Sequence, residues 1–345
     1  MNNLYLPAGW LNIPYVAQLD AWLIVILGSR QIGKTYGTLL YMLDNNIRHI
    51  LLRRTTAEID MITADTSLSP YKVYEPDYKV GIFKKAKKLA QICDYAVNKD
   101  DEKVIIKDIR GIATSLAEIS HIRGFNGSVY SDLIFDEFIP EKSVITRKTE
   151  GDAFLNAYAT INGNRELEGK PPLRAWLLAN TNNINSSILE ALNLTDIVLT
   201  MQRKGQELYC ENGIAIILPR SEAITDLRKQ TALMKQVSRE SEFYGMALEN
   251  RFSYDENIYI KQRSIKHMKP AWSYGDLFYA WDFADGFYIC RAKFTKGGMR
   301  YAADQVGREK LSREWAILKN YYYADMMLFS DLRVLAFFKN IFDID

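Results

Sequence analysis

A glycine-rich loop near the start of the chain holds the residues best suited to chemistry. The stretch GSRQIGKT fills the fixed positions of the pattern G-x-x-x-x-G-K-[ST] with Gly28, Gly33, Lys34 and Thr35. The glycines let the backbone turn several N–H groups toward one point, where a helix N-terminus adds partial positive charge. In such a loop the lysine reaches the β- and γ-phosphates of ATP and the hydroxyl ligates Mg²⁺. We expect the other loop residues to line the same site: Ser29, Arg30, Gln31, Ile32 and Tyr36.

The segments on either side of this loop have the character that a phosphate-binding loop requires. Residues 22–27 (WLIVIL) form a continuous apolar run of strand length, typical of a parallel strand buried on both faces. Residues 36–43 have helical spacing and good helix formers. The alternative is a plain glycine-rich corner between a strand and a helix. The match in both flanks favours the nucleotide site.

A second chemical pair, Asp136 and Glu137, follows the short apolar run of residues 133–135 (LIF). If that run is a buried strand, Asp136 emerges at its carboxyl end, where α/β sheets place ligands. There Asp136 can hold the Mg²⁺ shell, and Glu137 can polarise a water for attack on the γ-phosphate. An Asp-Glu pair by itself is more often a solvated loop start. After a strand it favours ATP hydrolysis.

Two further apolar runs end in polar residues and fit the same sheet. Residues 49–54 (HILLRR) end in Arg53 and Arg54, and residues 174–180 (RAWLLAN) end in Asn180. Polar side chains at such strand ends face the phosphates, so Arg53 is expected to sense the γ-phosphate and Asn180 to orient the attacking water. The alternatives are a surface ion pair for either arginine and simple capping of the strand end for Asn180.

Taken together, these segments resemble the large-terminase-like packaging ATPases of tailed phages, and most closely the small phi-29-like packaging motors. The resemblance is carried by LLRRTTAEI, IRGFNGSVYSDLIFDEFIPEK, NGNRELEG and LLANTNN, and more loosely by SEFYGMALENRF (241–252) and ADMMLFSDLRVLAFF. It implies an α/β fold of the P-loop NTPase (ASCE) type, with a parallel sheet flanked by helices. The motifs are specific in the first 185 residues.

The resemblance also implies the assembly and its partners. Such motors are homomeric rings, expected here as a pentamer, that dock on the portal of an empty procapsid and drive double-stranded DNA inward with ATP. They act in the host cytoplasm, are bound to the portal vertex only transiently and are not expected in the mature virion. Whether a structural RNA joins the motor is left open. The residues carried over onto matching motif positions are Lys34, Thr35, Asp136 and Glu137.

A basic residue acting across the subunit boundary is a further implication of the resemblance. Arg123 falls where the family has a basic residue proposed for this role, and Arg165 matches a second family arginine. Gly163 replaces a basic residue of the family's arginine-rich stretch. We therefore rank Arg123 first, with Arg165 and Arg147 as rivals, because a cation placed in trans can stabilise the transition state.

The densest basic run of the chain is FKKAKK, residues 83–88. In a ring, one such run per subunit would build a positive channel that contacts DNA phosphates without reading sequence. The alternative is the solvated face of a helix. The candidate DNA contacts are Lys84, Lys85, Lys87 and Lys88.

Composition is compatible with a soluble, intracellular protein. Charged residues make up 25% and the formal net charge is +2, so any contact with nucleic acid has to come from a local patch. No apolar run reaches the roughly 18 residues needed to span a bilayer, and the first twenty residues do not read as a secretory signal. The cysteines are three in number and far apart, which fits a reducing compartment: Cys93, Cys210 and Cys290.

The expected domains are a P-loop ATPase domain (1–200), a connecting or lid region (201–255) and a small α+β domain (256–345). In the last, residues 277–283, 287–294 and 298–304 are predicted to form an antiparallel meander, followed by helices at 311–323 and 331–342. By resemblance this domain is a vestigial RNase H-like nuclease. Asp282 sits where such a nuclease has its first carboxylate, with Asp285 and Asp304 as its nearest companions.

Two alternatives to the motor remain. An active terminase would also cut DNA, which needs several converging carboxylates. A P-loop kinase for a small molecule would not need Glu137 beside Asp136, and would have an acceptor site and a lid.

Overall fold

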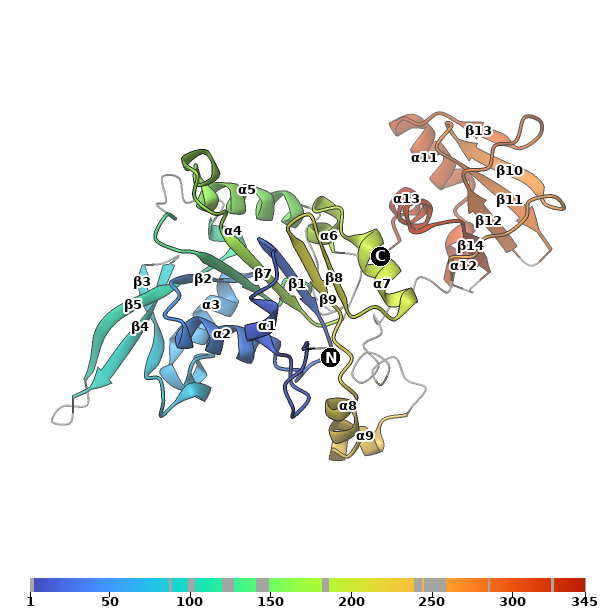
Figure 1. Cartoon of the computed structure of the whole chain (residues 1–345). Coiled ribbons are helices and arrows are strands. Elements are labelled where there is room, and N and C mark those ends of the chain that lie inside the picture. Colours follow the sequence, from blue (N-terminus) through green and yellow to red (C-terminus); the bar gives the residue numbers. More distant parts are fainter. Residues whose placement is uncertain are drawn as a thin grey trace. The chain divides into compact units, whose positions relative to one another are not determined.

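The structure is a computed structural model that describes residues 3–86, 89–98, 103–119, 127–140, 149–181, 186–238, 244, 259–284, 286–323 and 326–344. The chain divides into two compact units, Met1–Tyr254 and Asp255–Asp345. Each unit has its own sheet and its own hydrophobic core. Figure 1 colours the first unit from blue to yellow and the second from orange to red.

The first unit is built on one large sheet, with nine strands among the described residues. Their order across the sheet is β3-β4-β5-β2-β6-β7-β1-β9-β8. The run from β5 to β9 is parallel, and β3, β4 and β8 add antiparallel strands at the two edges. The strands are β1 (Leu23–Leu27), β2 (His49–Arg53), β3 (Val80–Ala86), β4 (Leu89–Val97), β5 (Val104–Ser115), β6 (Asp132–Asp136), β7 (Arg174–Ala179), β8 (Leu208–Glu211) and β9 (Ile214–Ile217).

The central strands have the continuous apolar sequences that a strand covered on both faces requires. Every residue of β1 and of β6 is buried. In the parallel register Leu27 lies opposite Ala179, and Asp136 lies opposite Leu178. The carboxyl ends of these strands therefore meet at one edge of the sheet. The expected α/β fold with a large sheet is confirmed.

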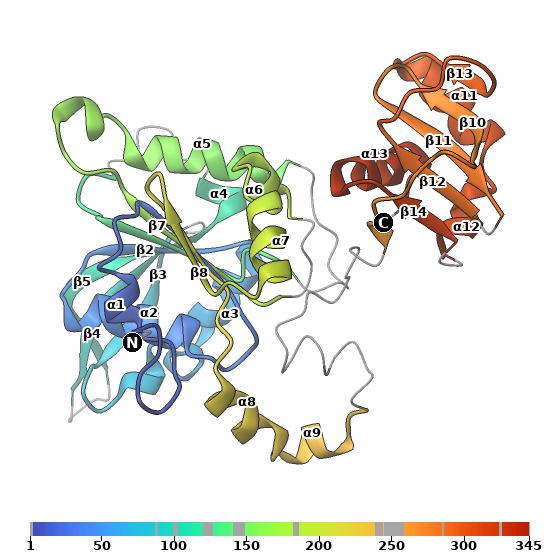
Figure 2. The same ribbon diagram turned by 45° about the vertical axis from the view of Figure 1, so that its right-hand side comes forward.

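Helices cover both faces of this sheet (Figures 1 and 2). On one face, Leu39 of α2 and Ile59 of α3 share a buried cluster with Ile24 of β1. On the other face, the ring of Phe154 in α5 stacks on Phe135 of β6 with centroids 6.0 Å apart. The helices are α1 (Ile13–Val16), α2 (Lys34–Asp44), α3 (Thr56–Ala64), α4 (Leu116–Ile119), α5 (Glu150–Asn162), α6 (Ser187–Ala191), α7 (Thr195–Lys204), α8 (Glu222–Lys229) and α9 (Ala232–Gln236).

Two edge regions of the first unit differ from the sequence expectation. Lys84 and Lys85 lie in strand β3, which pairs with β4, so the alternative of a helical face is wrong for these two lysines. Residues 201–255 were expected as a connecting region with short strands and a charged helix; their strands β8 and β9 join the large sheet. Strand β9 pairs directly with β1, the strand that precedes the glycine-rich loop. The sheet of the first unit therefore includes residues up to Ile217.

The second unit holds a five-stranded sheet of order β13-β10-β11-β12-β14 among its described residues. Strands β10, β11 and β12 form an antiparallel meander, whereas β13 runs parallel to β10 and β14 runs parallel to β12. The elements are β10 (Lys269–Tyr274), β11 (Phe278–Phe283), β12 (Gly286–Cys290), β13 (Met299–Tyr301), α11 (Gln305–Glu314), α12 (Leu318–Tyr323), β14 (Met327–Phe329) and α13 (Leu332–Phe342).

The sequence expectation for this sheet is only partly correct. The meander begins one strand earlier than predicted, at β10, and the segment at 298–304 does not continue it but pairs on the far side of β10. Strand β10 was missed because it begins with Lys269 and Pro270, residue types that are unfavourable inside a strand. Strand β14 was missed because only three residues pair there. Asp282 consequently lies near the end of β11, which is the second strand of this sheet along the chain and its central strand in space.

Helices α11, α12 and α13 share one buried core with the strands of the second unit. The large aromatic side chains of this core pack closely, with ring centroids of Phe338 and Phe342 4.6 Å apart. Among the residues that the structure describes in the two units, no helix is both long enough and apolar enough to cross a membrane.

Candidate active site

The glycine-rich loop runs from β1 into α2 with the backbone that its glycines permit. Gly33 has φ 90°, in the left-handed region, and precedes the first helical residue, Lys34. A Cβ atom on Gly28 would come within 2.8 Å of the Pro219 side chain, so a larger residue would not fit there. The amide of Gly28 donates to the carbonyl oxygen of Ala179 over 3.2 Å, which ties the loop to the end of β7.

The ammonium group of Lys34 is buried inside this loop. Its Nζ donates hydrogen bonds to the carbonyl oxygens of Gly28 and Ser29, each over 2.8 Å, and to Oδ1 of Asn180 over 3.1 Å. Burial lowers the pKa of Lys34 to about 7, although the nearby Asp136 carboxylate acts in the opposite direction. A phosphate group beside Lys34 would restore its charge, so the site is suited to an anionic ligand.

Two arginines add positive charge to the same region. Arg30, exposed within the loop, and Arg228, a buried residue of α8, both lower the pKa of Lys34 by repulsion. The pKa of Arg228 is itself lowered, first by burial and then by Arg30. Arg228 was missed from the sequence because α8 is far from the loop along the chain. Three cations gathered around one helix N-terminus favour a polyphosphate.

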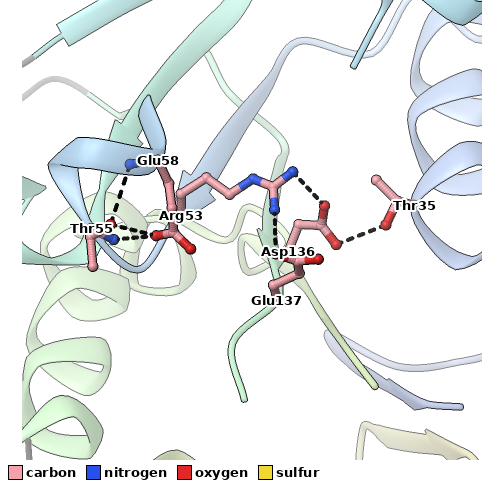
Figure 3. A network of polar contacts seen from close by, with 6 residues as sticks. All are labelled: Thr35, Arg53, Thr55, Glu58, Asp136 and Glu137. Carbon is pink, nitrogen blue, oxygen red and sulfur yellow. Dashed lines mark hydrogen bonds and ion pairs between the residues drawn. The ribbon is translucent and has the colours of Figure 1, made fainter. Parts of the chain in front are cut away.

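The loop and the end of β6 meet through Thr35 and Asp136. The Thr35 hydroxyl donates to Oδ1 of Asp136 over 2.8 Å (Figure 3). One hydroxyl and one carboxylate are the protein donors that Mg²⁺ takes when phosphates and waters supply its remaining ligands. The residues present therefore fit a magnesium nucleotide. Within the described residues, no group of three or more His, Cys, Asp or Glu side chains forms a metal-binding cluster.

Arg53, at the end of β2, bridges both carboxylates of the Asp-Glu pair (Figure 3). Its guanidinium lies 3.0 Å from Oδ2 of Asp136 and 3.2 Å from Oε2 of Glu137. Glu137 has φ 56°, a left-handed backbone that is uncommon for a residue with a side chain. Its side chain is 58% exposed, so it is accessible to a water molecule. The sequence predicted these residues but not their direct contact.

Lys34, Thr35, Asp136 and Glu137 line one cavity of about 1040 Å³, whereas Arg53 contacts the two carboxylates without being among the lining residues. The polar end of the cavity contains the loop residues with Asp136, Glu137 and Asn180. Apart from Tyr36, which the sequence predicted, its apolar end was missed by the sequence analysis, because the other residues come from a segment before β1 and from later turns of α2. The apolar residues lining it are Leu6, Trp10, Leu11, Ile13, Pro14, Tyr36, Leu40 and Tyr41.

Trp10 is the most prominent of the residues that the sequence analysis missed. It is 42% exposed, and it lies 3.6 Å from the position that a Cβ atom on Gly33 would take. The amide of Leu11 donates to the carbonyl of Ile32 over 3.2 Å, so the segment is bonded to the loop. A tryptophan kept open to solvent beside a phosphate loop provides a surface for an aromatic base. A tryptophan in a turn gave no sequence signal for this role.

The residues proposed to act on a neighbouring subunit stand apart from this cavity or outside the described residues. Arg165 is not among the residues that line the cavity. Its guanidinium donates to the carbonyl oxygens of Gly127, Ser128 and Tyr130 in its own chain. Other predicted residues lie outside the described residues: Arg123, Arg147, Lys87, Lys88 and Asp285.

The remaining predicted residues lie away from the cavity, and two of them, Lys84 and Asp304, have side-chain contacts of their own. Lys84 forms an exposed ion pair with Asp60 at 2.6 Å, and Lys85 is exposed on the same strand. In the second unit, Asp304 caps α11 by accepting from the amide of Gly307, which gives it a structural role. Asp282 pairs in register with Lys269 and Phe287.

Comparisons with known proteins agree with the geometry of both units. The model of the family described as Podovirus DNA encapsidation protein (Gp16) matches residues 10–276. The structure of the Phi-28 gp11 DNA packaging motor aligns with a TM-score of 0.59 at 16% identity, covering 100% of this chain and 99% of that one. The bacteriophage Phi-29 viral genome packaging motor assembly aligns with a TM-score of 0.58 at 18% identity, covering 96% and 99%. No curated protein matches the sequence at a significant level. At these identities the structural similarity shows a shared fold.

Proposed function

The chain belongs to the Podovirus DNA encapsidation protein (Gp16) family, and on this premise we propose that it is an ATP-driven motor for double-stranded viral DNA. The first unit is the ATPase. It binds ATP, hydrolyses it and uses the free energy to move DNA into a preformed capsid. The resemblance of the sequence motifs to the phi-29-like packaging motors supports the same proposal.

One observation carries the ATPase assignment. Lys34, Thr35, Asp136 and Glu137 line a single cavity beside the glycine-rich loop, in which Gly33 has a positive φ. ATP fits this cavity with its phosphates at the polar end and its base at the apolar end. Lys34 binds the β- and γ-phosphates, and the loop amides donate to the same oxygens. Trp10 packs against the base.

Hydrolysis needs a water held in line with the γ-phosphate. Glu137 is exposed to solvent and is the group that orients this water and accepts its proton. Asn180 already contacts Lys34 and is placed to orient the γ-phosphate or the water. Thr35 and Asp136 would hold Mg²⁺, which supplies charge neutralisation of the phosphates when it is bound. Arg53 is the γ-phosphate sensor, since it reaches both carboxylates from the neighbouring strand.

The motor acts as a homomeric ring, and a pentamer is our proposal for its size. In a ring, an arginine from one subunit completes the site of the next and couples their turnover. Arg123 is the first choice for this role, with Arg165 and Arg147 as rivals. The contacts of Arg165 with carbonyl oxygens of its own chain favour a structural role for that residue.

The proposed partners are double-stranded DNA and the portal of the procapsid, where the motor is bound transiently in the host cytoplasm. DNA phosphates would contact the exposed end of β3, which carries Lys84 and Lys85. Contacts of this kind do not read sequence, as a packaging motor requires. Whether a structural RNA takes part is tested by measuring assembly of the motor on the portal with and without added RNA.

The second unit is proposed to be a vestigial RNase H-like nuclease that has lost cutting. In the described residues Asp282 lies in β11, the second strand of its sheet in chain order, and Asp304 serves as a helix cap. Incubation of supercoiled plasmid with the full chain and Mn²⁺ is expected to leave the plasmid intact. Metal-dependent nicking that disappears in Asp282→Ala would instead identify an active terminase.

The function is tested by steady-state ATP hydrolysis with and without duplex DNA. We expect duplex of any sequence to raise kcat, and added salt to weaken the effect because phosphate contacts are screened. Phosphate release that is indifferent to duplex would refute the motor. Transfer of the γ-phosphate to a small acceptor, without release to water, would identify a kinase.

A further inference from the structure

Two consecutive arginines form the corner between β2 and α3. Arg53 is the last residue of β2, opposite Ser115 of β5 in the parallel register. Thr55 already belongs to the capping box of α3, in which its side chain and that of Glu58 satisfy each other's backbone amides (Figure 3). Arg54 is therefore the single residue between the end of the strand and the cap of the helix.

Arg54 binds Glu150 through two nitrogens. Its NH2 group donates to Oε1 over 2.7 Å and its Nε donates to Oε2 over 3.3 Å. The side chains are 5% and 17% exposed, so the pair is largely shielded from water. A bidentate pair fixes the direction of both side chains, and removing one charge would leave the other buried without compensation.

Glu150 belongs to a helix that packs on the sheet of the first unit. It is the first residue of α5, and Phe154 one turn later stacks on Phe135 of β6. Phe135 immediately precedes Asp136, the carboxylate that Arg53 contacts. The Arg54–Glu150 pair thus ties the corner after β2 to the helix that packs over β6.

Two groups of the Arg53 guanidinium are paired and one is not. Its NH1 and NH2 groups reach Glu137 and Asp136, but its buried Nε atom makes no hydrogen bond. The backbone at Arg53 is held on its strand side by the register with Ser115 of β5 and on its helix side by the corner that Arg54 anchors.

We propose that Arg54 and Glu150 are a positioning pair that holds the backbone at Arg53 so that its guanidinium meets Asp136 and Glu137. This inference rests on the proposed ATPase function, because it assigns the pair to the orientation of the catalytic glutamate. The pair does not touch the nucleotide. The competing explanation is that the ion pair only stabilises the fold and has no effect on Arg53.

The test is a double-mutant cycle in the full-length chain. Glu150→Gln keeps the size of the side chain, removes its charge and replaces one of the two oxygens that accept from Arg54 with an NH2 donor. We expect kcat for ATP hydrolysis to fall about three- to tenfold while KM changes less than about twofold. In the Arg53→Lys background the same substitution is expected to have little further effect on kcat, because the guanidinium that it positions is already gone.

A matched control comes from Asp94→Asn, which removes one charge from the Arg110–Asp94 ion pair, 2.8 Å long against 2.7 Å for Arg54–Glu150. That pair is outside the cavity, and kcat should stay at the wild-type value. A Glu150→Gln variant with wild-type kcat would overturn the positioning role. So would a fall in kcat of equal size in the Arg53→Lys background.

Thermal unfolding supplies a readout that does not depend on activity. The shifts in Tm caused by Glu150→Gln and Arg53→Lys should not add in the double variant, because both act on one corner. Additive shifts would refute the positioning pair whatever the kinetics show. A wild-type chain without any ATP hydrolysis would refute the proposed function. The Tm values of the two single variants and the double variant would still show whether the Arg54–Glu150 pair is coupled to Arg53 or stabilises the fold independently of it.

Discussion

The hydroxyl of Thr35 donates a 2.8 Å hydrogen bond to Oδ1 of Asp136, so the loop after β1 and the end of β6 meet at one pair of atoms. Both residues line the cavity beside the glycine-rich loop. This contact joins residues 101 positions apart in the chain. It makes the proposed metal-binding half of the site dependent on the order of the strands, since β1 and β6 are separated only by β7.

Replacement of Thr35 by Val should therefore abolish productive metal binding while keeping the shape of the side chain. We expect kcat to fall about a hundredfold, equivalent to about 2.7 kcal/mol of transition-state stabilisation. Thr35→Ser restores the hydroxyl and should retain most activity. ATP hydrolysis measured over a series of Mg²⁺ concentrations checks both variants, and equal activity of Val and wild type would exclude the hydroxyl as a ligand.

Replacement of Glu137 by Gln should separate binding from turnover. The amide keeps the size of the side chain but cannot accept the proton of the attacking water, so kcat should fall by about 10²–10⁴. Affinity for ATP, measured by equilibrium binding, should stay close to wild type. Glu211→Gln, an exposed position on β8, serves as the control. Wild-type turnover in Glu137→Gln would move the catalytic role to another group.

Replacement of Trp10 by Ala should weaken nucleotide binding rather than catalysis. Loss of the aromatic surface at the apolar end of the cavity is expected to raise KM about tenfold, consistent with an aromatic contact of about 1 kcal/mol plus lost apolar burial. The value of kcat should change little, and Trp10→Phe should recover most of the affinity. Leu167→Ala, at a side chain 88% exposed, is the control. An unchanged KM in Trp10→Ala would place the base elsewhere.

The stability of the first unit should fall in mild acid because of His49. Burial lowers the pKa of His49 below its ordinary value of 6.5, and its ring contacts the Tyr71 hydroxyl and the carbonyl of Ile47. As the pH falls through 6.5, the unfolded chain takes up this proton before the folded chain does. The free energy of unfolding should therefore decrease from pH 6.5 down to the folded pKa and then level off, as far as this group is concerned.

Thermal unfolding between pH 7.5 and 5 measures this effect. His49→Gln should flatten the pH dependence even if it lowers Tm at every pH. His267→Gln, on an exposed residue of the second unit, should leave the dependence unchanged. An equal pH dependence in His49→Gln and wild type would assign the acid sensitivity to other groups.

The central part of the fold could be predicted from the sequence because its signals are local. A strand buried on both faces needs a continuous apolar run, and β1, β2, β6 and β7 all have one. The turn into α2 needs glycine at Gly33, where φ is positive. The weakly patterned strands β10 and β14 could not be found in the same way, because their pairing depends on partners distant in the chain.

The sequence by itself determined which residue types come at the ends of the buried strands, and therefore which chemistry this chain can do. Lys34, Asp136, Glu137 and Asn180 are named by their motifs and by the apolar runs before them. The tertiary structure alone decided which of these groups touch. The contacts of Arg53 with two carboxylates and the place of Trp10 beside Gly33 follow from strand order and register. Those are set by the packing of the whole core, and no local stretch of sequence contains that information.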